Sequence, residues 1–331
     1  FQILMKYLVK NICLFAFVFG LFISADAWAL WGEQREAYTS ASFLGRGGAM
    51  SSDVSDYNAI FVNPAGLVKI EEPAFNVEFQ IEGSTHVGDN MTALFGYTNH
   101  WHANDEADIE KLRDQNTRAK LAFLAMYMQK NFAVALVSSG AMDMAYDGET
   151  VPNVHTFAVG DIDLQMSASR GFLENERLRI GATAKILYRT ARTGYLSYND
   201  LATIGVKPSG PYTDEGLAFS FDVGSQYSWY FKQYELSVAL SALDLATPYG
   251  IKTKFLGSTT GDRPPIMPAR VVAGAGFLVP NVFSNFKLRT NLDIVKSLTR
   301  NETSILDWIH WGVELKFPMY LAIRGGFNQG Y

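Results

Sequence analysis

Thiols and long apolar spans are both scarce in this 331-residue chain. Its one cysteine, Cys13, lies in an N-terminal apolar stretch that is typical of a cleaved secretion signal. We therefore expect a mature chain without disulfides, cysteine-ligated zinc or a lipid anchor on cysteine. After residue 29, no apolar run approaches the ~20 residues that a helix needs to cross a bilayer, so a helical membrane protein is not expected.

Basic tracts and catalytic motifs are missing as well. With 28 basic and 33 acidic side chains the net charge is −5, and no cluster of cations is available for a nucleic-acid backbone. The chain contains no G-x-S-x-G and no H-E-x-x-H sequence. His100, His102 and Asp105 share one segment and could bind a metal, but scattered polar loop residues are the simpler interpretation. We predict no nucleic-acid partner, no enzyme activity, no cofactor and no metal.

The N-terminal sequence predicts a secretion signal. Lys6 and Lys10 supply a positive region, residues 12–23 supply an apolar region, and Ala-Trp-Ala at residues 27–29 supplies a cleavage site. A membrane anchor is the alternative, but the apolar region is shorter than the ~20 residues of a spanning helix. We expect residues 1–29 to be removed.

From residue 75 onward, apolar and polar side chains alternate with the period of a strand that has one apolar face and one polar face. Aromatic residues and glycine are abundant, with 16 Tyr, 23 Phe, 6 Trp and 28 Gly, which is typical of a large all-β protein with aromatic belts. The clearest strands are expected at residues 75–83, 162–168, 178–189, 217–223, 234–240, 271–279, 286–294 and 309–317.

The connections between the expected strands alternate in length, and this pattern separates a membrane barrel from a soluble sandwich. Short turns are expected at residues 129–130, 172–177, 232–233, 280–285 and 318–319, and long connections at 84–117, 141–156, 190–215, 246–269 and 296–307. Short turns at one rim and long loops at the other are typical of outer-membrane barrels. We count eleven strands, whereas a closed barrel of this kind needs an even number, so we expect C-terminal strands to be missing from this sequence.

Residues 42–67 precede the first strand, and their composition predicts a compact plug. Gly45, Gly47 and Gly48 give the backbone a freedom that packed helices and strands do not need, and Asn63-Pro64 fixes a turn. An ordinary glycine-rich loop is the alternative interpretation. Because short turns place the start of the first strand on the periplasmic side, this segment would lie below the barrel and could fold into it.

The run GRGGAMSSDVSDYNAIFVNPAGL resembles the N-terminal signature of the FadL/PorV superfamily of outer-membrane proteins, and Asn63, Pro64, Ala65 and Gly66 match its Asn-Pro-Ala-Gly block. Residues 239–245, 292–296, 312–317 and 321–331 also look like barrel repeats of PorV-like proteins and of related spirochaete outer-membrane proteins.

The resemblance implies an all-β fold, a transmembrane antiparallel β-barrel of about fourteen strands, with an N-terminal lumen plug. The expected organisation is a signal peptide at 1–29, a plug at 30–72 and the barrel at 73–331. The expected location is the outer membrane of a Gram-negative-type envelope, with the lipid bilayer as a partner. FadL-like members take up long-chain fatty acids or other hydrophobic molecules, and we favour this function for the chain. PorV-like members instead assist a secretion system at the cell surface, with a secreted protein as partner.

Plug and lumen residues form the candidate site. We assign gating to Gly45, Gly47, Gly48, Asn63, Pro64, Ala65 and Gly66, and lumen charge to Arg179, Lys185, Arg189, Lys287, Arg289, Asp161 and Asp163. Mixed charges can pair across a narrow lumen and seat a plug, whereas an ion-selective pore tends to carry one sign. Cross-strand pairing is the simpler interpretation of these charges. The more specific alternative is that an Arg or Lys binds the carboxylate of a substrate. An apolar substrate would first meet the loop aromatics Tyr195, Tyr198, Tyr212 and Phe255.

Overall fold

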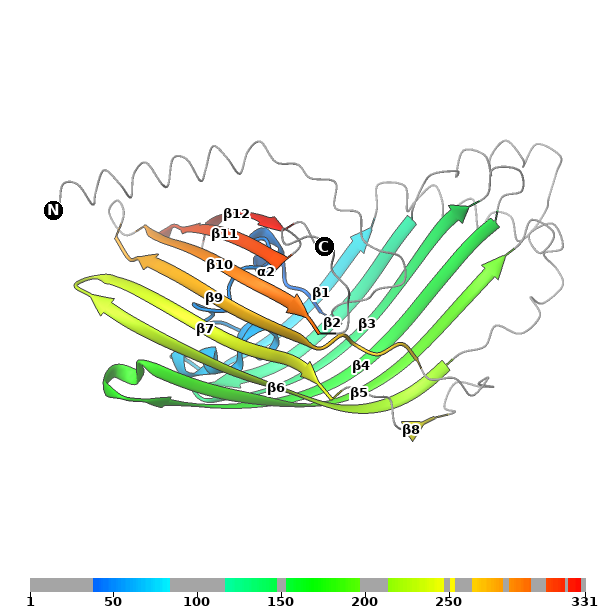
Figure 1. Ribbon diagram of the computed structural model, residues 1–331, viewed down its shortest axis with the longest axis horizontal. Helices are drawn as coiled ribbons and strands as arrows, with labels where there is room; N and C mark the ends of the chain where they lie inside the picture. Colours follow the sequence, from blue (N-terminus) through cyan, green and yellow to red (C-terminus); the bar gives the residue numbers. More distant parts are fainter. Residues whose placement is uncertain are drawn as a thin grey trace.

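The computed structural model describes residues 38–83, 117–147, 153–196, 214–246, 251–253, 264–281, 286–298, 308–318 and 321–328. These residues form a single antiparallel sheet of twelve strands (Figure 1). The strands are β1 (Ala74–Gly83), β2 (Thr117–Gln129), β3 (Phe132–Asp147), β4 (Asn153–Phe172), β5 (Leu178–Leu196), β6 (Asp214–Phe231), β7 (Tyr234–Leu245), β8 (Ile251–Lys252), β9 (Arg270–Val279), β10 (Lys287–Ser297), β11 (Ile309–Lys316) and β12 (Ala322–Asn328).

The sheet is a meander. Neighbours along the chain pair with each other from β1 to β7 and from β9 to β12, while β9 pairs with β7 and the two-residue β8 pairs with β6. The remaining eleven strands agree with the predicted count of eleven, of which eight were placed by the alternation of side chains, so the all-β antiparallel prediction is confirmed. β1 and β12 form the two edges, and the sheet is not closed.

Several strands are longer than predicted, and two connections are correspondingly shorter. The connection expected over residues 190–215 is limited to 197–213, because β5 ends at Leu196 and β6 begins at Asp214. A long connection was expected over residues 141–156, but β3 continues to Asp147 and β4 begins at Asn153, which face each other in the ladder. The expectation was wrong because polar side chains in this stretch resemble a loop although the backbone pairing continues. Only residues 148–152 separate the two strands.

The short turns lie together at one end of the sheet. The turns after β2, β4 and β6 must share an end because consecutive strands are antiparallel and adjacent. Asn131 and Lys232 adopt positive φ angles of 69° and 57° in two of these turns. Aromatic pairs gather near the same end, with Tyr227 and Trp229 ring centroids 4.6 Å apart and those of Phe286 and Phe317 4.8 Å apart.

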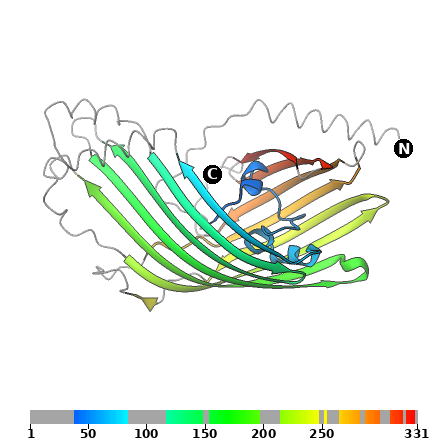
Figure 2. The same ribbon diagram turned by 180° about the vertical axis from the view of Figure 1, so that it is seen from behind.

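The helices are short and belong mainly to the segment before β1. They are α2 (Ala41–Gly45), α3 (Ala59–Val62) and the 3₁₀ helix η1 (Pro64–Lys69), with a further 3₁₀ turn, η2 (Glu174–Glu176), after β4. Among the described residues, no helix has the length and apolar character needed to cross a membrane. Residues 38–73, here called the N-terminal segment, lie on one face of the sheet, which bends around them (Figures 1 and 2). We call this the inner face and the opposite face the outer face.

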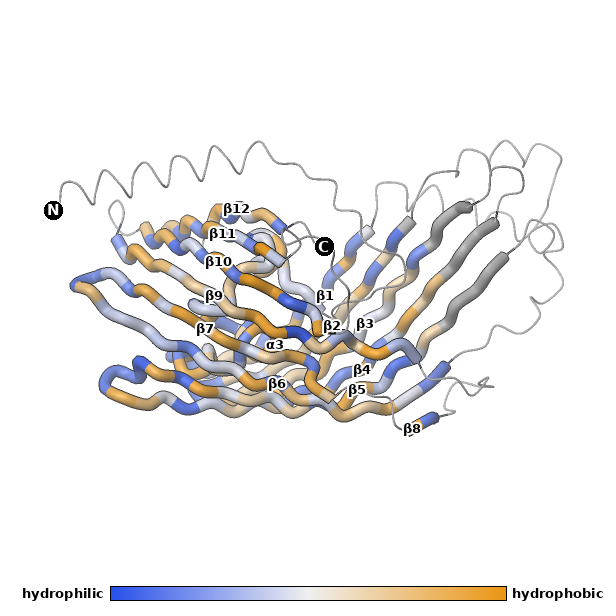
Figure 3. Tube along the Cα trace, in the orientation of Figure 1, coloured by the Kyte–Doolittle hydropathy of each residue, from blue (hydrophilic) through white to orange (hydrophobic). Residues whose placement is uncertain are grey.

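The two faces have the reverse of the usual polarity. On β6 the outer side chains of Phe219 and Phe221 are 58% and 47% exposed, whereas the inner side chains of Ser220 and Asp222 are 5% and 0% exposed. A similar alternation of apolar and polar residues runs along several other strands, whereas β2 and β3 also carry apolar side chains on the inner face (Figure 3). Buried inner residues include Asp161, Asp163, Gln165, Ser167, Arg179, Thr183, Lys185, Arg189, Gln226, Ser228, Ser237, Ser241, Asn291, Asp293 and Glu314.

Candidate functional site: the inner face and the N-terminal segment

The Asn-Pro-Ala-Gly block fixes the middle of the N-terminal segment. Asn63 is fully buried, and its Oδ1 accepts a hydrogen bond from the backbone N–H of Ala65 at 3.1 Å, which caps η1. Pro64 occupies the first turn of η1, where a missing N–H costs nothing. Nδ2 of Asn63 donates to the carbonyl oxygens of Ser51 and Ser225 at 3.0 and 3.1 Å, so one amide joins two parts of the segment to β6.

Gly66 lets this turn pack against the preceding part of the segment. A Cβ at Gly66 would lie 2.5 Å from the carbonyl oxygen of Val54, too close for any side chain. Ala65 is fully buried beside it. The structure thus brings Asn63, Pro64, Ala65 and Gly66 together in one compact turn that contacts the inner face.

Gly45, Gly47 and Gly48 act at the other end of the segment. Gly47 and Gly48 have φ angles of 59° and 74°, which favour glycine, and they follow directly on α2. A Cβ at Gly47 would lie 2.6 Å from the backbone nitrogen of Phe327, and one at Gly45 would lie 3.2 Å from Cβ of Arg324. The glycine-rich turn therefore packs closely on β11 and β12.

A second set of glycines lies in the strands beneath the segment, and sequence reasoning missed it. At each position a Cβ would overlap atoms of the segment, such as Asn63 above Gly224 and the Arg46 carbonyl above Gly312. The set comprises Gly181, Gly224, Gly274, Gly276, Gly312 and Gly326. Isolated glycines inside strands often mark close approach of another backbone, and this signal could have found them.

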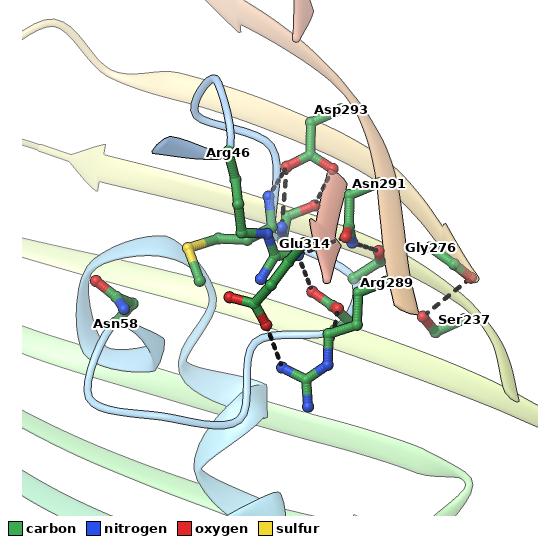
Figure 4. Close-up of polar contacts among 12 residues, drawn as sticks. Arg46, Asn58, Ser237, Gly276, Arg289, Asn291, Asp293 and Glu314 are labelled. Carbon is green, nitrogen blue, oxygen red and sulfur yellow. Dashed lines mark hydrogen bonds and ion pairs between the residues drawn. The ribbon is translucent and has the colours of Figure 1, made fainter. Parts of the chain in front are cut away.

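Two carboxylates on the segment and the sheet organise the polar contacts (Figure 4). Asp293 of β10 accepts hydrogen bonds from the backbone N–H groups of Met50 and Ser51 and from Ser51 Oγ, each at 2.9 Å. Asp53 forms a buried 2.7 Å ion pair with Arg46 inside the segment. Arg46 also donates to Asn291 of β10, so the pair is held against the sheet.

The Asp53 pair extends into a chain of alternating charges. Arg289 lies 3.8 Å from Asp53 and 3.8 Å from Glu314, and Glu314 also pairs with Arg324 at 2.6 Å. Burial by itself would raise the pKa of Asp53, but Arg46 and then Arg289 outweigh it and hold this pKa below its ordinary value. The carboxylate is therefore charged at neutral pH and links the segment electrostatically to β10 and β11.

A further ion pair anchors the end of η1. Lys69 Nζ lies 2.7 Å from Glu235 Oε1 of β7, and Ser228 donates to the same oxygen at 2.7 Å. Burial lowers the pKa of Lys69, and Glu235 opposes that effect. Contacts to β6, β7, β10 and β12 thus attach the segment along much of the sheet.

The charges predicted for the lumen lie mostly on the inner face and are paired within it. Arg189 forms a two-pronged bond with Asp161, its register partner, at 2.7 and 2.9 Å, which confirms the predicted cross-strand pairing. Lys185 lies 2.8 Å from Asp222 and 2.7 Å from Asp244.

The other members of the set have different surroundings. Gln165 donates to Asp163 at 2.6 Å, and Arg179 donates to Ser228 at 2.9 Å and to Tyr230 at 2.7 Å. Lys287 lies at the exposed start of β10. Arg179 also lies 4.0 Å from Glu235, and the inner face as a whole carries charges of both signs.

Apolar residues form a tract on part of the inner face. Buried side chains of β2 and β3 join Leu187, Ala218 and Met267 and the apolar side of the segment in one cluster. Its members from the sheet are Ala122, Leu124, Met126, Met128, Ala133, Ala135, Val137, Leu187 and Ala218, and those from the segment include Phe43, Met50, Val54, Ile60, Val62 and Leu67. The segment is therefore held by a hydrophobic core as well as by polar contacts.

Some predicted residues lie outside the described part of the chain. These are the possible metal-binding residues His100, His102 and Asp105, and the loop aromatics Tyr198, Tyr212 and Phe255. Tyr195 belongs to β5, but its side chain is also outside the described set.

Comparison of the chain with protein-family models, with curated proteins and with solved structures found no match in any of the three. The resemblance to the FadL/PorV superfamily therefore stays a prediction that depends on the motif residues themselves.

Proposed function

We propose that this protein is an outer-membrane β-barrel channel for hydrophobic small molecules such as long-chain fatty acids, closed by its N-terminal segment acting as a plug. The reversed polarity of the sheet is the observation that carries the proposal. Rows of exposed apolar side chains are costly in water, at about 25 cal/mol for each Å² of apolar surface, but favourable against lipid. The polar inner face, in contrast, must be kept away from lipid, and the enclosed interior of a barrel would do this.

The outer face of β6 has the height that a bilayer requires. The outer positions from Leu217 to Trp229 are apolar or aromatic except for Ser225, and Tyr227 and Trp229 fit an aromatic girdle. Roughly twelve residue steps of ~3.3 Å cover ~40 Å along the strand, which corresponds to ~28 Å across the bilayer at a tilt of ~45°. A membrane barrel has no open edge, so β1 and β12 would each need a further strand partner when the protein is in the membrane.

The filled interior supports gated passage of apolar molecules more than free diffusion of ions. Inner charges such as Arg189 and Lys185 already have carboxylate partners, and the inner apolar tract offers a surface for a hydrocarbon. Because the segment contacts β6, β7 and β10, passage requires that part of it shift. A molecule would then leave through the lumen or sideways between strands.

Two measurements test this function. The protein should fractionate with the outer membrane and change its gel mobility on boiling, and a deletion strain should lose uptake of a labelled long-chain fatty acid. Uptake should return with the wild-type gene. A soluble periplasmic species without a gel shift would contradict the membrane location. Normal uptake in the deletion strain, with co-isolation of a secreted protein, would instead support the PorV-like role as a secretion partner.

A further inference from the structure

A second stretch of irregular chain, besides the N-terminal segment, lies on the inner face. Residues 264–269 (Pro-Pro-Ile-Met-Pro-Ala) lead into β9, and three prolines restrict their backbone. Met267 is only 4% exposed, whereas its neighbour Ile266 is 53% exposed. This stretch thus has one side chain directed into the protein and one directed away.

Arg189 connects this stretch to the wall. Two of its nitrogens, Nε and Nη2, donate to Asp161, and its third, Nη1, donates to the carbonyl oxygen of Pro265 at 2.8 Å. The far end is fixed to the sheet, since Leu298 donates its backbone N–H to Ala269 at 2.8 Å. One guanidinium therefore serves both the cross-strand ion pair and the inner stretch.

Met267 joins the stretch to the core beneath the N-terminal segment. It belongs to the same buried apolar cluster as Leu187 and Ala218 of the sheet and Val54 and Leu67 of the segment. Methionine is flexible and polarizable, so it fills irregular gaps and can repack around a ligand.

We propose that residues 264–269 form an inner strap, latched by Arg189, that covers the apolar tract from the long-connection side. An apolar ligand binds by displacing Met267 from the cluster, with release of the bond between Arg189 and Pro265. The strap and the N-terminal segment would then open the same core from two sides. The choice of an apolar ligand rests on the proposed function. The accessibility of Met267 under the strap can be measured without a transport assay.

The test uses a single cysteine at position 267. In a Cys13→Ser background, Met267→Cys should react slowly with a charged methanethiosulfonate reagent, and Ile266→Cys should react fast and set the upper limit. Arg189→Lys keeps a cation beside Asp161 but loses the planar fork that reaches Pro265. It should raise the labelling rate at Met267→Cys about tenfold, which corresponds to about 1.4 kcal/mol. Oleate, used as the apolar probe, should also raise the rate without any change at Arg189.

Arg179→Lys is the matched control, because Arg179 is an equally buried inner arginine whose partners Ser228, Tyr230 and Glu235 lie on β6 and β7 and not on the strap. It should leave the rate at position 267 unchanged, and the gel shift on boiling verifies that each variant is folded. Equal rates in the Arg189 and Arg179 variants, or labelling of Met267→Cys as fast as Ile266→Cys in the parent, would overturn the strap. No response to oleate, with the Arg189 effect intact, would overturn ligand displacement. Loss of the proposed transport function would show in uptake, not in these rates.

Discussion

Gly224 is a glycine because the Asn63 side chain occupies the space where its Cβ would lie. Asn63 makes three hydrogen bonds from that position, to Ser51, Ala65 and Ser225. A methyl group on β6 would therefore disturb the turn that joins the N-terminal segment to the sheet, although Gly224 itself belongs to no recognisable motif.

We expect Gly224→Ala to weaken attachment of the N-terminal segment by about 1–3 kcal/mol, the usual cost of overpacking. Protease cleavage within residues 38–73 should become faster, and single-channel conductance should rise. Gly140→Ala is the matched control, because the nearest atom to a Cβ at Gly140 is 3.9 Å away. Unchanged cleavage and conductance in both variants would mean that the segment is only a leader to β1.

Asp53 gives the attachment a defined dependence on pH. Its pKa in the folded protein is below the ordinary value because Arg46 and Arg289 outweigh the effect of burial. Its contribution is therefore complete above the unfolded value of about 3.9 and is lost as the pH falls through the lower folded value.

We expect Asp53→Asn to lower the free energy of unfolding by about 3 kcal/mol at pH 7, since it leaves Arg46 buried without its carboxylate partner. Denaturant unfolding of wild type and variant should show the same difference from pH 7 to about 5, and the difference should shrink only below about 4. A difference that already shrinks near pH 6 would show that the pKa of Asp53 is raised.

At the scale of the element, strands such as β6 are defined by the contrast between an apolar outer face and a polar inner face. Phe219 and Phe231 are outer residues of β6 with similar exposure, 58% and 55%. Phe231 ends the strand at the turn side, whereas Phe219 lies within the apolar row. In water the two positions would be equivalent, but in a bilayer they would differ in depth.

We expect Phe219→Arg to destabilise the protein by about 1–2 kcal/mol in lipid vesicles, between the midplane and interface costs, and Phe231→Arg by about 0–1 kcal/mol, because the cost of an arginine depends on its depth. Reversible unfolding in vesicles would measure both. Equal small effects at the two positions would contradict a lipid-facing outer face.

Most strands could be predicted from the sequence because their side chains alternate with a period of two, but the ends of the strands could not. Polar side chains of β3 and β4 beyond the apolar band look like a loop, although Asp147 and Asn153 still pair. In the site, Asn63-Pro64-Ala65-Gly66 was recognisable from local turn chemistry. Its partners Asp293 and Gly224 were not, because the register that places them under the segment is set by tertiary pairing.

At the scale of the molecule, the N-terminal segment holds two parts of the sheet together. Asn63 and Lys69 bind β6 and β7, while Asp53 and the loop at Met50 and Ser51 bind β10 through Arg289 and Asp293. The apolar cluster adds β2 and β3. Movement of the segment would therefore affect several strands of the sheet at once, as the proposed plug function requires.

The sheet also has a direction, because the short turns after β2, β4 and β6 lie at one end and β1 finishes at the other. In an outer-membrane barrel the short turns face the periplasm. In a Cys13→Ser background, Gly83→Cys at the long-connection end should react with a membrane-impermeant maleimide on intact cells, and Lys232→Cys in a turn should not. Both should react once the outer membrane is permeabilised. The reverse pattern would mean that the barrel is inserted with its turns outside, and the N-terminal segment would then enter the interior from the cell surface, incompatible with a plug that opens toward the periplasm.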